Sequence, residues 1–98
     1  MENHKINSII LRKDFREDEF NKYSYELTVR KGLETASFRI PLYSVGVTMT
    51  DAYGNDTETV LTDAFSDEGK AIRFYEFVLR NLATPLNLSF ILEDEAIH

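Results

Sequence analysis

Apolar and polar residues alternate with a period of two through roughly the first two thirds of the chain, as in β-strands that bury one face. The clearest run is 23–30, where tyrosine, leucine and valine alternate with serine, glutamate, threonine and arginine. Further runs predict strands over residues 6–11, 34–40, 42–50 and 56–62. The pattern therefore indicates a sheet whose strands bury one side.

The segments between these runs predict loops and turns. Residues 13–22 are dense in charge and predict an exposed loop. The pair Lys31-Gly32 predicts a turn, and residues 51–55 predict a hairpin loop in which a glycine adopts a positive φ. Pro41 has no backbone N–H, so it marks a sheet edge, a bulge or the end of a strand.

The period changes to that of a helix after residue 65. Ser66 is the expected N-cap, and the acidic residues that follow it complement the helix dipole. The apolar residues form one stripe at 100° per residue, made of Ala71, Ile72, Tyr75, Val78, Leu79 and Leu82. We expect a helix over about 66–82 that packs this stripe on one face of the sheet.

The segment after this helix fits two structures. Thr84 followed by Pro85 is a good N-cap and first-turn pair, which favours a short helix over about 85–95. Residues 86–92 also alternate as a strand would, and this is the alternative. The expected fold is thus a single small α+β domain over residues 1–98, an antiparallel sheet of four to five strands with one amphipathic helix and a short C-terminal helix.

Charge is distributed unevenly, with a formal net charge of −6. Residues 1–49 carry 8 basic and 7 acidic side chains, whereas residues 50–98 carry 3 basic and 10 acidic ones. An acidic half repels phosphate backbones, so we expect no direct nucleic-acid binding. The absence of cysteine and of any long apolar segment predicts a cytoplasmic protein that contacts no membrane.

Residues able to carry catalysis are scarce. The two histidines, His4 and His98, stand near the ends of the chain, and no glycine-rich phosphate motif is present. The carboxylates of residues 51–58 and 93–95 are explained by turn formation and solvation. We therefore expect no enzyme activity, no catalytic residue, no metal site and no cofactor.

One aromatic side chain lies outside the apolar stripe of the helix. Phe77 stands between Arg73 and Arg80, a composition suited to a partner contact with an apolar anchor and a polar rim. The sequence thus predicts a non-enzymatic protein-interaction or regulatory module that binds another protein or a second copy of itself. The alternative is an acidic nucleic-acid mimic or inhibitor that occupies a basic channel of a partner.

The C-terminal half also carries a family-like pattern. It comprises Tyr-Ser-Val-Gly-Val at 43–47, the Asn-x-x-Thr-Pro-x-x-Leu motif at 81–88 and Ile-Leu-Glu-Asp at 91–94. In these stretches the chain resembles a domain-of-unknown-function family of short bacterial, Firmicute-type proteins. The resemblance implies a structural or regulatory module with no established activity. Ser44 departs from the family pattern, in which a glycine is usual, and the glycine is displaced to Gly46.

Overall fold

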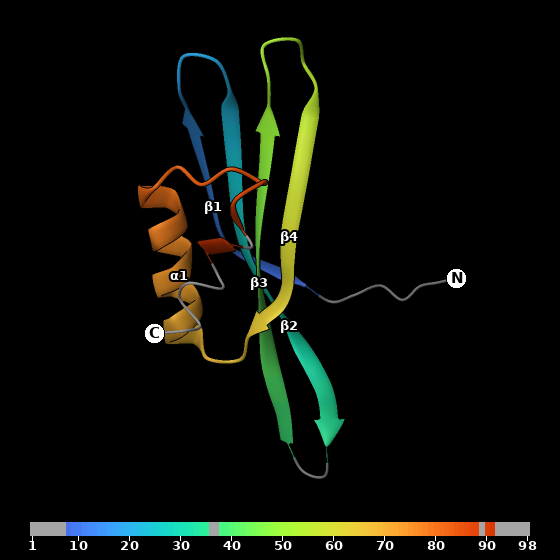
Figure 1. The fold of residues 1–98 in the computed structure, drawn as a ribbon. Helices are drawn as coiled ribbons and strands as arrows, with labels where there is room; N and C mark the ends of the chain where they lie inside the picture. Colours follow the sequence, from blue (N-terminus) through green and yellow to red (C-terminus); the bar gives the residue numbers. More distant parts are fainter. Residues whose placement is uncertain (1–7, 36–37, 89, 92–98) are drawn as a thin grey trace, which may run out of the picture.

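The computed structural model describes residues 8–35, 38–88 and 90–91. Within them, four strands form one antiparallel sheet in chain order (Figure 1). The strands are β1 (Ile9–Glu17), β2 (Lys22–Thr35), β3 (Phe38–Thr50) and β4 (Asp56–Phe65). The helix α1 (Glu68–Arg80) follows β4 and lies across one face of the sheet. The α+β class with a four-stranded antiparallel sheet and a packed helix is thus confirmed.

The charged segment 13–22 is not a loop, because residues 13–17 continue β1. Charged side chains are tolerated there because β1 is an edge strand with access to water. The turn is confined to the residues around Asp18, whose carboxylate accepts hydrogen bonds from the backbone N–H groups of Phe20 and Asn21. These two bonds stabilise the charged form and lower the pKa of Asp18.

The predicted turn at Lys31-Gly32 is also wrong, since both residues lie inside β2. The register with β3 shifts between Lys31 and Glu34, which marks a bulge. A Cβ atom on Gly32 would lie 2.4 Å from the carbonyl oxygen of Ile40, so the backbones approach too closely here for a side chain. Pro41 pairs with Lys31 within β3, and the strands predicted on either side of it form one long strand.

The hydrophobic core lies between α1 and the face of the sheet that it covers. Tyr25, Leu27, Val45 and Val47 of the two central strands are fully buried there. The helix contributes Ala71, Phe74, Tyr75, Val78 and Leu79. The predicted stripe of α1 is thus largely confirmed, although it missed Phe74.

The helix starts one residue later than expected. Its N-cap is Asp67 rather than Ser66, and the Asp67 carboxylate accepts from the backbone N–H of Lys70 at 2.8 Å. A carboxylate satisfies a free amide and also complements the helix dipole, so it is the better cap. Leu82 follows the end of α1 with a φ of 50°, the left-handed conformation that terminates many helices.

The chain then crosses the covered face again. Leu88 is fully buried in the core, and the hydroxyl group of Tyr25 donates to the carbonyl oxygen of Ala83 at 2.8 Å. Thr84 donates its backbone N–H to the side-chain oxygen of Asn87, and the backbone is helical at Leu88 and at residues 90–91. Residues 85–87 form a turn, and residues 89 and 92–98 lie outside the described part, so the predicted helix over 85–95 is not shown. The described residues of 86–92 form no strand in the sheet.

Candidate functional site

The face of the sheet opposite α1, here called the open face, is a candidate surface for binding. Paired residues on adjacent strands share a face, so the register arranges this surface in cross-strand rows. The rows are Lys13 with Glu26, Gly46 and Val60; Phe15 with Ser24, Thr48 and Glu58; and Ile10 with Thr28 and Ser44. The central strands therefore present small or polar residues, and the outer strands present both apolar residues and the charged Lys13 and Glu58.

Small side chains on β2 and β3 leave a shallow hollow of about 190 Å³ in the open face. Gly46 lies at its lining, and a Cβ atom there would approach Val60 Cγ2 to 3.3 Å. Lys13 and Glu26 line the same hollow and form an ion pair with 3.8 Å between Nζ and Oε2. Its hydroxyl groups and the ion pair suit contact with a polar or mixed partner surface.

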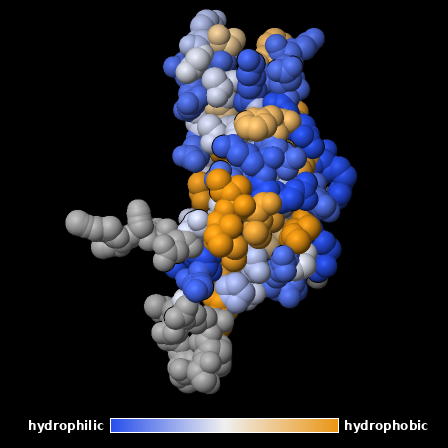
Figure 2. Space-filling view, turned by 180° about the vertical axis from the view of Figure 1, so that it is seen from behind, coloured by the Kyte–Doolittle hydropathy of each residue, from blue (hydrophilic) through white to orange (hydrophobic). Residues whose placement is uncertain are grey.

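Apolar side chains gather in the middle of the open face, framed by hydrophilic residues (Figure 2). Ile10, Phe15 and Val60 of the outer strands are 56%, 66% and 46% exposed. An antiparallel sheet that simply faces water carries polar residues on that side, so these exposed apolar residues need another explanation. Exposed apolar side chains next to polar ones are typical of protein-binding surfaces.

A hydrogen-bonded network spans three strands at one end of the open face. The Arg30 guanidinium of β2 binds both carboxylate oxygens of Asp63 in β4. The backbone N–H of Asp63 donates to the Ser44 hydroxyl at 2.9 Å. Asp63 lies in a bulge with a φ of 53°, and its carboxylate raises the pKa of Arg30 by accepting these bonds. All these groups are engaged with one another, so the network fixes the bulge in β4.

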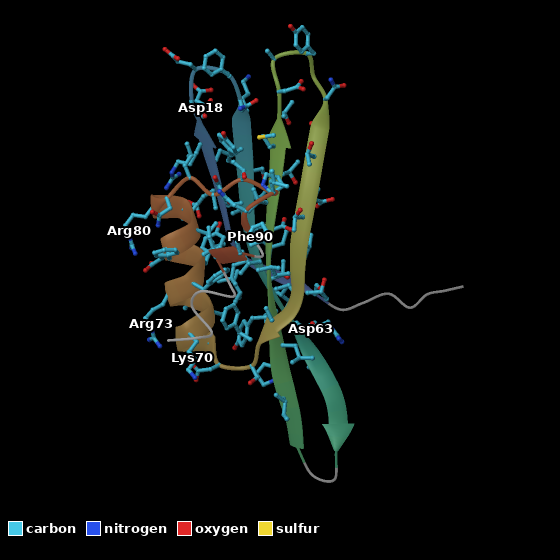
Figure 3. All side chains as sticks on the ribbon, viewed as in Figure 1. Asp18, Asp63, Lys70, Arg73, Arg80 and Phe90 are labelled. Atoms are coloured by element: carbon cyan, nitrogen blue, oxygen red, sulfur yellow. The ribbon has the colours of Figure 1, made fainter. Side chains whose placement is uncertain are left out.

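The predicted contact residues lie on the outer side of α1, remote from the open face. Figure 3 shows Lys70, Arg73 and Arg80 pointing away from the sheet. Phe77 is half-buried, and the Arg80 guanidinium lies over its ring at 5.7 Å from the centroid. The structure thus brings Phe77 and Arg80 together on one helix face, and their contact with a partner stays a prediction.

A second polar cluster joins the edge strand β1 to the helix. The Tyr75 hydroxyl donates at 2.8 Å to Asp14 and lies 3.0 Å from the carbonyl oxygen of Tyr25. Arg12 covers the Tyr75 ring and forms an ion pair with Glu76. Burial raises the pKa of Tyr75, and the hydrogen bond to Asp14 raises it further, so the hydroxyl stays protonated and serves as a structural donor.

Other classes of site find little support in the described part of the chain. In that part, no group of three or more histidine, cysteine, aspartate or glutamate side chains is placed to hold a metal ion. His4 and His98 lie outside the described residues. No helix among the described residues is long and apolar enough to cross a membrane.

Comparison with protein-family models, curated proteins and solved structures finds no match to this chain. The resemblance to a domain-of-unknown-function family of Firmicute-type proteins therefore stays a prediction.

Sequence reasoning identified the helix surface and missed the open face. The alternation in strand 23–30 separates its two faces clearly. The sequence signal for the open face is an apolar residue at a position where a water-facing strand would carry a polar one. Phe15 in the charged segment and Val60 among threonines are examples. Phe15 and Val60 come onto one surface only because the four strands pair into a sheet.

Proposed function

We propose that this domain is a non-enzymatic interaction module that binds another protein through the open face of its sheet. The observation that carries the proposal is the exposure of Ile10, Phe15 and Val60 on the one sheet face that α1 leaves uncovered. Burying these side chains against a partner removes apolar area from water, at roughly 25 cal/mol per Å².

The polar residues between these apolar side chains also favour binding. Lys13, Glu26 and Glu58 line the hollow and can pair with polar groups of a partner. The strands beneath are held rigidly by the buried core on the other side, so the surface is preorganised.

A comparison of matched variants tests the proposal. The wild-type chain and the variants Ile10→Lys and Phe15→Lys are used to capture partners from the cell that makes this protein, and bound proteins are identified by mass spectrometry. We expect a partner that the wild type retains and both open-face variants lose. Phe77→Lys, on the outer side of α1, serves as the control and should retain it.

Two results would contradict the proposal. The first is loss of the partner in Phe77→Lys with retention in both open-face variants, which would locate the contact on the helix. The second is an identical set of bound proteins for all four chains. Circular dichroism of each variant shows whether a loss reflects unfolding.

An acidic mimic of nucleic acid is the second candidate function. Its support is the excess of carboxylates in residues 50–98, where the three basic residues, Lys70, Arg73 and Arg80, all lie on α1. The β3–β4 hairpin, by contrast, carries Asp51, Asp56 and Glu58. Such a mimic would bind a nucleic-acid-binding partner with strong salt dependence, and DNA would displace it.

A further inference from the structure

The two edges of the sheet differ in how well they are protected against pairing with another strand. Natural edge strands are protected by bulges, prolines, lysines and charges that point inward. β1 has a register shift between Ile10 and Arg12, a high density of charge, and Arg12 and Asp14 on its covered side. Residues 57–62 of β4, Thr-Glu-Thr-Val-Leu-Thr, hold one charge and no proline or lysine.

The hydrogen-bonding phase of β4 follows from its hairpin with β3. The backbone N–H of Asp51 donates to the carbonyl oxygen of Asn55 at 2.9 Å, so these two residues form a hydrogen-bonded pair. Hydrogen-bonded and non-hydrogen-bonded pairs of residues alternate along an antiparallel ladder. The backbone N–H and C=O groups of Thr57, Thr59 and Leu61 therefore point toward β3. The backbone groups of Glu58, Val60 and Thr62 consequently point outward, and no described strand pairs with them.

We propose that the outer edge of β4 pairs with β4 of a second copy, antiparallel, about a two-fold axis at Val60. The Val60 residues of the two copies then form a hydrogen-bonded pair, and Glu58 of each copy pairs with Thr62 of the other. This register joins two exposed apolar side chains and avoids opposing carboxylates, whereas an axis at Glu58 would place two of them face to face. Figure 1 shows α1 across one face of the sheet, and no described strand lies beyond β4.

A second copy is the occupant that this edge fits best. An antiparallel pair of identical strands is isologous, so one patch supplies both sides of the contact. The pairing lengthens the sheet to eight strands and places the two open faces on the same side of it. It goes beyond the open-face contact proposed above and shares only Val60 with it. The two contacts are distinguished through Ile10 and Phe15, which lie on the other edge strand.

The mass of the full chain in solution is the first test. Light scattering from micromolar to millimolar protein should show the wild type rising from 11.4 kDa toward twice that mass. Val60→Pro removes only a backbone N–H that points away from β3, and strands tolerate proline at such positions. Val60→Lys places one lysine of each copy at the two-fold axis, where their charges repel. Both should remain monomeric at every concentration, while Phe15→Lys should dimerise as the wild type does.

A cysteine variant tests the register. The chain has no cysteine of its own, so Val60→Cys supplies a single thiol. Residues in a hydrogen-bonded antiparallel pair have Cα atoms about 5.5 Å apart, which a disulfide can span. Mild oxidation should cross-link Val60→Cys at least tenfold faster than Tyr53→Cys, whose position at the hairpin tip is 89% exposed.

The proposal is overturned if the wild type remains monomeric throughout, as it would if this edge accepts a strand of a different protein. It is equally overturned if both Val60→Pro and Val60→Lys dimerise like the wild type, or if the two cysteine variants cross-link at the same rate. The open-face contact is tested separately with Ile10→Lys and Phe15→Lys, which leave Val60 and the β4 edge unchanged.

Discussion

The two faces of the sheet are built from the same strands and differ in how deeply their side chains are buried. On the covered face, Tyr25 and Leu27 are fully buried beneath α1, whereas their neighbours Glu26 and Thr28 on the open face are only half-buried. Apolar residues on the covered face interlock with the helix. Those on the open face stand at the outer strands around a polar hollow.

This contrast separates stability from contact along a single strand. Since successive side chains point to opposite faces, a substitution at one position acts on the core and a substitution at the next acts on the surface. Stability should therefore depend steeply on the covered face and weakly on the open face. The four predictions below test this difference, from the largest expected effect to the smallest.

The largest effect is expected from a neighbouring pair in β2. Leu27→Ala should lower the free energy of unfolding by about 2–5 kcal/mol, because it removes a fully buried side chain and leaves a cavity. Thr28→Ala, on the open face, should change it by about 0.5 kcal/mol or less. Chemical denaturation measures both, and equal losses would show that the open face is packed as a core.

The tyrosines of the covered face should make stability fall at alkaline pH. Burial raises the pKa of Tyr25 to about 12, above the value of about 10 in an unfolded chain. The protonated phenol is favoured by folding, so this stabilisation is complete below about pH 10 and is lost as the pH rises toward about 12. Tyr25→Phe should flatten this decline and also lower stability by about 1 kcal/mol through loss of the bond to Ala83.

The control for the alkaline profile is Tyr53→Phe at the exposed hairpin tip. Its denaturation curves should follow those of the wild type across the same pH range. If Tyr25→Phe also follows them, this tyrosine does not link folding to pH.

The cap of α1 should have an intermediate effect, because it holds the helix on the covered face without belonging to the core. Asp67→Ala should lower the unfolding free energy by about 1 kcal/mol, since it leaves the backbone N–H of Lys70 without its acceptor. Ser66→Ala should leave stability within about 0.5 kcal/mol of the wild type. A larger loss in Ser66→Ala than in Asp67→Ala, measured by thermal or chemical unfolding, would contradict the assigned cap.

The smallest effect is expected at the hollow in the open face. Gly46→Ala places a Cβ atom 3.3 Å from the exposed side chain of Val60, which can move aside. The change also reduces the freedom of the unfolded chain, so stability should stay within about 0.5 kcal/mol of the wild type. A loss above about 2 kcal/mol in denaturation would show that the two strands cannot yield at this contact.

Local patterns predicted the elements that depend on local chemistry. The strand 23–30, the hairpin loop 51–55 with Gly54 at a positive φ, and the apolar stripe of α1 are all confirmed. The errors arose where pairing with a neighbour outweighed local preference. Charge in residues 13–17 argued against a strand, and hydrogen bonding to β2 places these residues inside β1. The strands predicted on either side of Pro41 form one strand, in which Pro41 lies opposite Lys31 at the bulge in β2.

The candidate surfaces divide in the same way. The sequence by itself determined that Phe77, Arg73 and Arg80 share a helix face, because helical periodicity depends on spacing alone. It also determined which residues of the strands 23–30 and 42–50 share a side. Only the tertiary structure decided that α1 covers the tyrosine side of the sheet, that Ile10, Phe15 and Val60 share its open face, and that β4 ends the sheet. The physical reason is that strand order and register arise from hydrogen bonds between distant segments, and no local pattern encodes them.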